Sequence, residues 1–175
     1  MLCGRTDLKA IFNLGAGVDA ILHLGDALPR GVPLIRVDDA GMGVQMAEYV
    51  SHAVLRHFRR FDEYDAQQIG GQWHPLAQHT KADFSIGILG LGVLGNCIID
   101  GLRHYGFPLL GWSRSAKQIA GVECFSGCDG LDAFLRATKV LVVILPLTTE
   151  TENLLDATQL AKLKQGAYVI NVARG

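Results

Sequence analysis

Residues 90–95 form a glycine pattern of the kind that binds phosphate groups, Gly90-Leu91-Gly92-Val93-Leu94-Gly95. A short apolar run precedes it at 84–89, and apolar residues with helical spacing follow it over 93–104. At such a strand-to-helix junction, the first glycine permits a tight turn and the second lets the backbone approach a pyrophosphate. The third lets the helix pack against the strand, and the free N–H groups at the helix N-terminus receive the phosphates. We therefore expect a dinucleotide to contact Gly90, Gly92, Val93, Leu94 and Gly95.

The glycine pattern alone is weak evidence, and two alternatives stand beside a dinucleotide site. Glycine-rich turns also occur without any ligand, and methyltransferases place a glycine turn after their first strand. A methyltransferase would bind a methyl donor and would not bind NADPH. The order of strand, glycine turn and helix favours the dinucleotide over both alternatives.

The segment after the second expected strand indicates which dinucleotide is bound. It reads Gly111-Trp112-Ser113-Arg114-Ser115-Ala116-Lys117 and contains no carboxylate. NAD-binding chains usually place Asp or Glu about 20 residues after the glycines to hold the ribose 2′-hydroxyl. Arg114 instead offers a planar fork of donors that suits a 2′-phosphate, and Ser113, Ser115 and Lys117 can add hydrogen bonds or charge. NADP(H) is the expected cofactor and NAD(H) the alternative, whereas a solvated basic loop would need no ligand.

Strands and helices alternate from residue 84 onward. We expect strands at 84–89, 108–112, 122–125, 140–145 and 167–172, and helices at 93–104, 131–138 and about 156–163. Asp156, followed three residues later by Gln159, resembles a capping box that opens the last helix. Strands that are apolar throughout and alternate with helices indicate a parallel sheet covered on both faces. The expected fold class is α/β, a doubly wound Rossmann-type sheet.

The first 44 residues have a different pattern. It consists of a strand at 9–14, a glycine loop at 15–17, a helical start at 18–24 and a strand at 33–37. Two strands and a short helix cannot enclose a core alone. We expect 1–44 to be part of a second α/β domain and 45–175 to be the nucleotide-binding domain. A helix at 45–65 would bridge the two domains, and an exposed loop would follow at 66–83.

Composition and charge limit the kinds of partner and the cellular compartment to be expected. The formal net charge of -1 gives no electrostatic reason to expect nucleic acid or an anionic membrane as a partner. The longest apolar run, 140–147, is far shorter than the ~18 residues that span a bilayer, and the N-terminus has no signal-peptide pattern. We therefore expect a cytoplasmic protein. Among the four cysteines, Cys3, Cys97, Cys124 and Cys128, the last two are separated by three residues. No second Cys or His pair completes a zinc site with them, so neither a metal nor a disulfide is expected.

Several motifs in a fixed order resemble those of the D-isomer-specific 2-hydroxyacid dehydrogenases. They are the glycine pattern at 90–95, Leu145-Pro146-Leu147-Thr148 with Thr151, and Asn171-Val172-Ala173-Arg174-Gly175. In addition, Asn13-Leu14-Gly15-Ala16-Gly17-Val18-Asp19 resembles the substrate-binding loop of that family. Residues 39–43, 45–49 and 112–114 are most similar to the branch that reduces glyoxylate and hydroxypyruvate. The resemblance covers essentially the whole chain.

The resemblance implies hydride transfer from NADPH to a short 2-oxoacid, glyoxylate or hydroxypyruvate. Arg174 matches the catalytic arginine, which binds the substrate carboxylate and polarises the carbonyl. Ala16 and Gly17 match loop positions whose N–H groups hold that carboxylate. The positions that match the cofactor site are Leu145, Pro146, Val172, Ala173 and Arg174. The resemblance also implies a flavodoxin-like substrate domain and a homodimer formed through the nucleotide-binding domain, with helix 45–65 and the loop around Trp73 as the candidate surface.

The resemblance further implies catalytic groups that this sequence does not contain. The proton-donating His of the family, and the Glu that holds it, lie beyond the motif at 171–175. None of the six histidines has an equivalent location: His23, His52, His57, His74, His79 and His104. We therefore expect a fragment that is inactive alone. A nucleotide-binding module without turnover, like the corepressor relatives of the family, is the alternative function.

Overall fold

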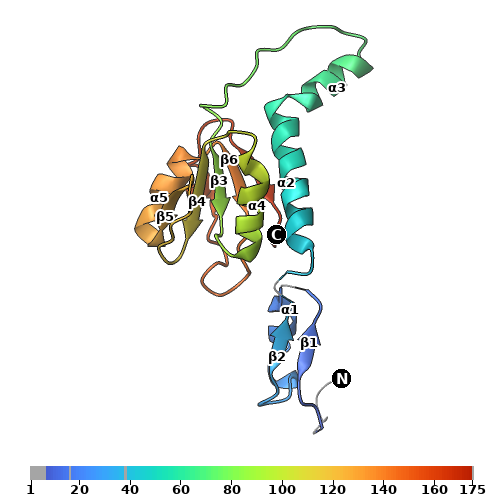
Figure 1. Ribbon diagram of the computed structural model, residues 1–175, viewed down its shortest axis with the longest axis vertical. Helices are drawn as coiled ribbons and strands as arrows, with labels where there is room; N and C mark the ends of the chain where they lie inside the picture. The colour runs from blue at the N-terminus through green and yellow to red at the C-terminus, as the bar shows by residue number, and fades with distance from the viewer. Residues whose placement is uncertain (1–6, 16, 38, 175) are drawn as a thin grey trace.

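A five-stranded parallel sheet forms the centre of the computed structural model, which describes residues 7–15, 17–37 and 39–174 (Figure 1). The strands are β3 Ile86–Leu89, β4 Leu109–Ser113, β5 Glu123–Ser126, β6 Val140–Val143 and β7 Tyr168–Asn171. They lie in the order β5-β4-β3-β6-β7, and every pairing is parallel. From β3 the chain runs outward through β4 and β5 and then crosses back to β6. The strand order thus reverses between β3 and β6, which confirms the predicted doubly wound fold.

Apolar side chains cover both faces of this sheet. The helices that pack on it are α2 Met42–Phe58, α4 Val93–Arg103 and α5 Gly127–Ala137. Successive residues of a strand point to opposite faces. Val140 and Val142 therefore join the buried cluster under α2 and α4, whereas Leu141 and Val143 join the cluster under α5. The whole of β6 is buried, as expected for a parallel strand between two helical layers.

Helices α2 and α4 approach closely because small residues face each other. A Cβ on Gly101 of α4 would lie 2.9 Å from the Cβ of Ala47 on α2. Nearer the start of α2, a Cβ on Gly43 would lie 2.6 Å from the Sγ of Cys97. This packing fixes the first turns of α2 next to the first turns of α4, where the glycine pattern ends.

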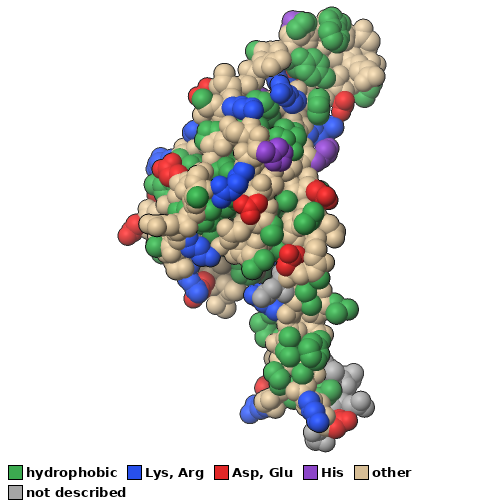
Figure 2. Space-filling view, viewed as in Figure 1, with side chains coloured by type: hydrophobic (Ala, Val, Ile, Leu, Met, Phe, Trp, Pro, Cys, Tyr) green, Lys and Arg blue, Asp and Glu red, His purple; other side chains and the backbone are tan. Residues whose placement is uncertain are grey.

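Residues 7–37 form a small unit at one end of the molecule, which we call the N-terminal unit (Figure 1). Its elements are β1 Ile11–Asn13, α1 Asp19–Leu22, a 3₁₀ turn at Gly25–Ala27 and β2 Leu34–Arg36. The two strands pair in parallel, which agrees with the strand, helix and strand predicted here. None of the described residues of the unit is buried, and Phe12 is 71% exposed. Figure 2 shows hydrophobic side chains on its surface. The described residues of the unit therefore form no buried core of their own.

The single helix predicted at 45–65 is wrong. Helix α2 ends at Phe58, and a separate helix, α3 (Phe61–Ile69), begins after a break at Arg60. Arg60 has a left-handed backbone with φ of 60°, a conformation that a continuous helix does not contain. The loop predicted at 66–83 consequently begins only after α3 has ended.

Burial explains why the helix breaks at this point. Phe58 is buried against Phe84, with ring centroids 4.9 Å apart, so α2 stays on the sheet up to its last residue. Helix α3 buries none of its residues and extends away from the sheet (Figure 1). Arg60 donates to both carboxylate oxygens of Glu63 and to the carbonyl of Ala77, which ties the break to the loop that follows.

Over the described parts of the chain, no helix has the length and apolar character needed to cross a membrane.

Two other helices differ from their predicted limits. Helix α6 (Ala157–Leu160) is shorter than the predicted 156–163. The Asp156 side chain accepts from the Gln159 N–H at 2.7 Å, as predicted for the cap, but the Gln159 side chain accepts from Lys162 instead of reaching back. Only half of the capping box is therefore present. Helix α5 begins at Gly127 and not near 131, because the Trp112 indole donates to the Gly127 carbonyl at 2.9 Å and anchors an additional first turn.

Candidate active site

A cavity of about 440 Å³ lies between the N-terminal unit and the carboxyl ends of the sheet strands. Four segments line it: the N-terminal unit, the first turns of α2, the start of α4, and the loops after β6 and β7. The lining residues that the sequence predicted are Gly17, Gly92, Val93, Leu94, Gly95, Leu145, Pro146, Val172, Ala173 and Arg174. The cavity lies where the strand order reverses, which is where ligands bind in open α/β sheets.

The glycines of the pattern differ in what surrounds them. Gly90 has φ of 122°, and a Cβ there would lie 3.0 Å from the Ile144 carbonyl oxygen. A Cβ on Gly95 would lie only 2.0 Å from the Gly90 carbonyl oxygen, so both positions are required by the turn itself. At Gly92, by contrast, a Cβ would meet nothing within 4 Å. Gly92 therefore leaves room for a ligand and not for another part of the chain.

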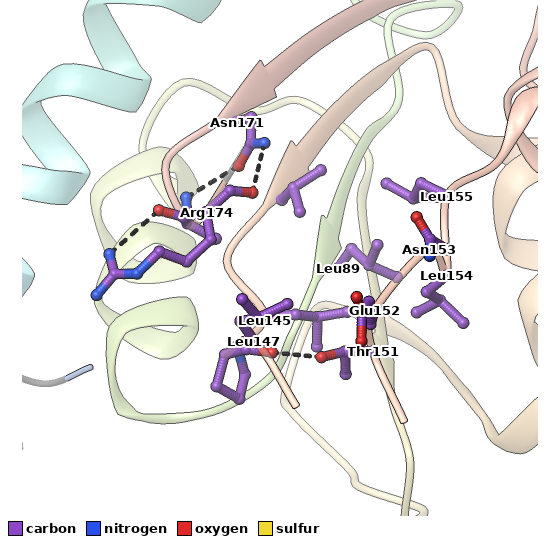
Figure 3. A pocket seen from close by; sticks show the side chains of 13 residues that line it. Leu89, Leu145, Leu147, Thr151, Glu152, Asn153, Leu154, Leu155, Asn171 and Arg174 are labelled. Carbon is purple, nitrogen blue, oxygen red and sulfur yellow. Dashed lines mark hydrogen bonds between the residues drawn. The ribbon is translucent and has the colours of Figure 1, made fainter. Parts of the chain in front are cut away.

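Arg174 follows β7 and enters the cavity from the sheet side. Asn171 holds this turn, because its side chain donates to the Arg174 carbonyl and accepts from the Ala173 N–H, each at 3.0 Å (Figure 3). The guanidinium Nε donates to Asp19 of the N-terminal unit, at 3.2 Å from Oδ2 and 3.3 Å from Oδ1. This hydrogen bond from Arg174 holds the pKa of the Asp19 carboxyl below its usual range.

The glycine loop of the N-terminal unit lies directly against the guanidinium. A Cβ on Gly17 would lie 2.1 Å from Nη2 of Arg174, so any side chain there would displace the arginine. Asn13 holds the loop by donating to the carbonyls of Gly15 and Gly17, each at 2.8 Å. Ala16, the other predicted loop residue, lies outside the described residues. The loop that resembles the family's substrate-binding loop thus lies against the arginine that matches the family's catalytic arginine, and both line this cavity.

A second cavity of about 400 Å³ lies on the other side of the loop after β6. It shares Leu145, Pro146, Leu147, Ala173 and Arg174 with the first cavity. Thr151 Oγ1 donates to the Pro146 carbonyl and accepts from the Thr148 N–H at 2.9 Å, which fixes the loop between the two cavities. Figure 3 shows the Arg174 side chain pointing away from Leu154 and Leu155 of the second cavity. The arginine therefore serves the first cavity.

Comparison with protein families shows to which family the chain belongs. Residues 51–175 match the family model for the NAD binding domain of D-isomer specific 2-hydroxyacid dehydrogenases. The chain belongs to this family.

Similar proteins agree with that assignment. The whole chain is 51% identical to glyoxylate/hydroxypyruvate reductase A of Escherichia fergusonii and 49% identical to that of Yersinia enterocolitica. It spans 57% of the length of each of these relatives. The solved structure of a family member from Xanthobacter autotrophicus, in complex with NADPH and MES, superimposes with a TM-score of 0.91 at 45% identity and covers 97% of this chain and 53% of its own. The NADPH-dependent glyoxylate/hydroxypyruvate reductase of Sinorhizobium meliloti, in complex with NADP and sulfate, gives a TM-score of 0.90 at 42% identity over 97% of this chain and 54% of its own.

The segment predicted to select the dinucleotide lies outside both cavities. Arg114 extends into solvent, with 81% of its side chain exposed, and pairs with the exposed Glu150. Ser113 is buried and donates to the Ser115 carbonyl at 2.8 Å. Lys117 donates to the Leu91 carbonyl within the glycine turn. Arg114 and Ser115 are thus exposed to solvent, whereas Lys117 supports the turn.

Sequence reasoning named Asp19 only as part of a motif and did not assign it a role. Met42, Met46 and Arg36 also line the cavity and were not predicted as site residues. A carboxylate two residues after the last glycine of the loop was a signal for Asp19. Its partner Arg174, which follows β7, is 155 residues away in sequence, so only the folded chain reveals the pair.

The histidines closest to the sheet lie at its other end. His57 stacks on Tyr168, the first residue of β7, with ring centroids 4.3 Å apart, and His79 lies 5.9 Å from His57. Burial lowers the pKa of His57, which favours the neutral form of its imidazole. Because Arg174 follows the last residue of β7, these two histidines are separated from it by the length of the strand.

Proposed function

We propose that the protein reduces a short 2-oxoacid, glyoxylate or hydroxypyruvate, to the 2-hydroxyacid with NADPH. The chain spans little more than half of its curated relatives, so the activity of the whole protein is part of this proposal. The observation that carries it is the guanidinium of Arg174 at the cavity that the dinucleotide-binding glycines also line. An always-charged planar fork of donors in that position suits the carboxylate and carbonyl of a 2-oxoacid.

The residues around the glycine turn fit a dinucleotide. Gly92 has open space at its Cα, and no side chain caps the N-terminus of α4, so N–H groups there are free for phosphate oxygens. Arg114 is the residue proposed to hold a 2′-phosphate, and the segment 111–117 itself contains no carboxylate, which supports NADP(H) over NAD(H). Relatives solved with NADPH and with NADP support the same choice. When bound, the cofactor supplies the hydride.

Arg174 performs the step that this chain contributes to catalysis. Its guanidinium binds the carboxylate of the substrate and stabilises the negative charge that develops on the carbonyl oxygen. The backbone of the loop at Gly17 is proposed to hold the same carboxylate from the other side of the cavity. Leu145, Pro146, Val172 and Ala173 line the cavity between the glycine turn and Arg174 and keep it largely apolar.

The proton that completes the reaction must come from another group. Among the described residues, no histidine lines the cavity that contains Arg174. The family resemblance assigns this role to a His that follows the motif at 171–175.

We also propose that residues 1–44 belong to the substrate-binding domain and 45–175 to the nucleotide-binding domain.

Assembly as a homodimer through the nucleotide-binding domain is also proposed. The exposed apolar side chains of Phe61, Ile69 and Trp73 lie on α3 and the loop that follows. Trp73 is 88% exposed, and such side chains on an extended arm are typical of an interface. Phe58, the last residue of α2, is buried in the core and is not part of this surface. Sedimentation of the intact protein tests this proposal, and a monomer would contradict it.

The function is tested by following NADPH oxidation by the intact protein with glyoxylate and with hydroxypyruvate. We expect turnover that Arg174→Ala lowers by about 10²- to 10³-fold in kcat/KM, the range for loss of a preorganised donor to a developing oxyanion. The dissociation constant for NADPH should change much less than kcat/KM, because the glycine turn is intact in the variant. Arg30→Ala, which removes an exposed arginine of the N-terminal unit, is the matched control. NADPH binding without oxidation would instead support a nucleotide-binding module, and no NADPH binding would contradict both.

A further inference from the structure

The contact between Asp19 and Arg174 joins the two sides of the cavity. Asp19 is the first residue of α1 in the N-terminal unit, and Arg174 follows β7 of the sheet. The Asp19 side chain is 16% exposed and that of Arg174 is 50% exposed. A carboxylate that is this well covered, beside an arginine that is half open to the cavity, is placed to hold the arginine while leaving it accessible.

The geometry of the guanidinium shows which donors are used. Arginine has five N–H donors in a rigid plane, one on Nε and two on each Nη. Asp19 accepts from Nε, so it occupies the edge of the plane nearest the aliphatic stem. Nη1 makes only a long contact of 3.4 Å to the Ala173 carbonyl, and Nη2 lies over Gly17. The two Nη groups, which form the outer fork, thus remain directed at the cavity.

We propose that Asp19 is a positioning residue for the catalytic arginine. By holding the Nε edge, Asp19 stops rotation of the guanidinium and aims its outer fork at the carboxylate and carbonyl of the substrate. Because Asp19 belongs to the N-terminal unit, the arginine is aligned only when that unit sits against the sheet. The proposal rests on the proposed 2-oxoacid reduction and adds the residue that orients its main catalytic group.

A different role for Asp19 would have the opposite consequence. Its carboxylate is an anion at the same guanidinium that would bind the substrate carboxylate. If Asp19 only competed with the substrate, its removal would free Arg174 and strengthen substrate binding. If Asp19 positions Arg174, its removal weakens catalysis even though an opposing charge has been taken away. The sign of the change therefore separates the two roles.

The kinetic experiment uses Asp19→Ala and Asp19→Asn in the intact protein. We expect Asp19→Ala to lower kcat/KM for glyoxylate by about 10²-fold, the cost of misplacing a reacting group by about 1 Å. The loss should appear in kcat as well as in KM. Asp19→Asn keeps an oxygen that accepts from Nε, so it should recover all but about tenfold of the activity, the usual difference between a charged and a neutral acceptor. Asp26→Ala removes another carboxylate of the same unit, which pairs only with the exposed Arg30 among the described contacts, and should change nothing.

Two further readouts separate positioning from a loss of structure. The NADPH dissociation constant and the melting temperature should stay the same in all variants, because Asp19 touches neither the glycine turn nor a buried core. In ¹⁵N–¹H NMR spectra the Arg174 Nε–H signal should be protected from exchange with water in the parent and lost in Asp19→Ala. This comparison remains valid if the protein binds NADPH but does not reduce 2-oxoacids, which would overturn the proposed function alone. Unchanged or higher kcat/KM in Asp19→Ala, or an unchanged Nε–H signal, would overturn the role of Asp19.

Discussion

The two regions that enclose the cavity are built in different ways. On the sheet side, backbone packing fixes the wall, since a Cβ on Gly95 would lie 2.0 Å from the Gly90 carbonyl oxygen. The strands beneath are covered by buried clusters on both faces. In the N-terminal unit no described residue is buried, and polar side chains hold the wall of the cavity in place. Asn13 holds the glycine loop, and Asp19 ties the unit to Arg174.

Because the two regions are built differently, substitutions in them should have different effects on stability and on catalysis. A wall made by backbone and core cannot alter without a loss of stability, because native interiors are close-packed. A wall held by partly exposed polar side chains outside any buried core can shift at little cost in the free energy of unfolding. We expect substitutions on the sheet side to lower the free energy of unfolding. Substitutions in the N-terminal unit should instead lower kcat/KM.

The strongest test of the comparison places one extra methyl group on each side of the cavity. Gly95→Ala forces a Cβ against backbone and should lower the free energy of unfolding by about 1–3 kcal/mol, as overpacking does. In Gly17→Ala the new Cβ meets Nη2 of Arg174, which can swing away, so stability should change by less than about 0.5 kcal/mol. The displaced guanidinium should then lower kcat/KM by about 10²-fold. Urea unfolding and steady-state kinetics of both variants measure these effects.

Gly92→Ala is the control on the sheet side. Its Cβ would meet no protein atom within 4 Å, so the fold should be as stable as the parent while NADPH binding weakens. The comparison would fail if Gly95→Ala and Gly17→Ala lost equal stability. It would also fail if Gly17→Ala left kcat/KM unchanged.

Local sequence signals predicted the sheet region well because its determinants are local. Each strand is an apolar run, and the glycine pattern specifies its own turn, so the five strands and the doubly wound class of the sheet could be predicted. The helix predicted at 45–65 was wrong because its pattern continues through Arg60, whereas the break depends on Phe58 meeting Phe84 from elsewhere in the chain. Helix periodicity cannot reveal such a tertiary contact.

Cofactor choice gives the next largest expected effect, and it concerns the sheet region alone. Arg114→Asp replaces a donor fork by a carboxylate that repels a 2′-phosphate. We expect the preference for NADPH over NADH to fall by about 10- to 100-fold, the scale of a lost charge-assisted hydrogen bond. Stability should not change, because the Arg114 side chain is exposed. Calorimetric titration with both cofactors measures the preference, and equal dissociation constants for the two cofactors in the parent would contradict the role of Arg114.

The residues that sequence reasoning did not assign are those whose role depends on a distant partner. Asp19 lies in a recognised loop, yet nothing local indicates that its carboxylate meets Arg174. In the same way, Glu150 is one of several polar residues in the loop after β6, and only the fold brings it to Arg114. The crossover from β5 back to β6 sets the Arg114–Glu150 pair, because it brings together the loops that follow β4 and β6.

The smallest expected effect concerns this pair of exposed side chains. Glu150 accepts from the Arg114 guanidinium, which is the group proposed to hold the 2′-phosphate, so a bound phosphate must compete with the carboxylate. Exposed ion pairs contribute about 0–1 kcal/mol, so Glu150→Gln should tighten NADPH binding by no more than about fivefold. NADH binding should not change, since NADH has no phosphate at that position. Glu152→Gln, on the same loop, is the control, and the gain should shrink in high salt, which screens exposed charges. Weaker NADPH binding in Glu150→Gln would show that Glu150 orients Arg114 for the phosphate, as Asp19 is proposed to orient Arg174, and would remove this contrast between the two regions.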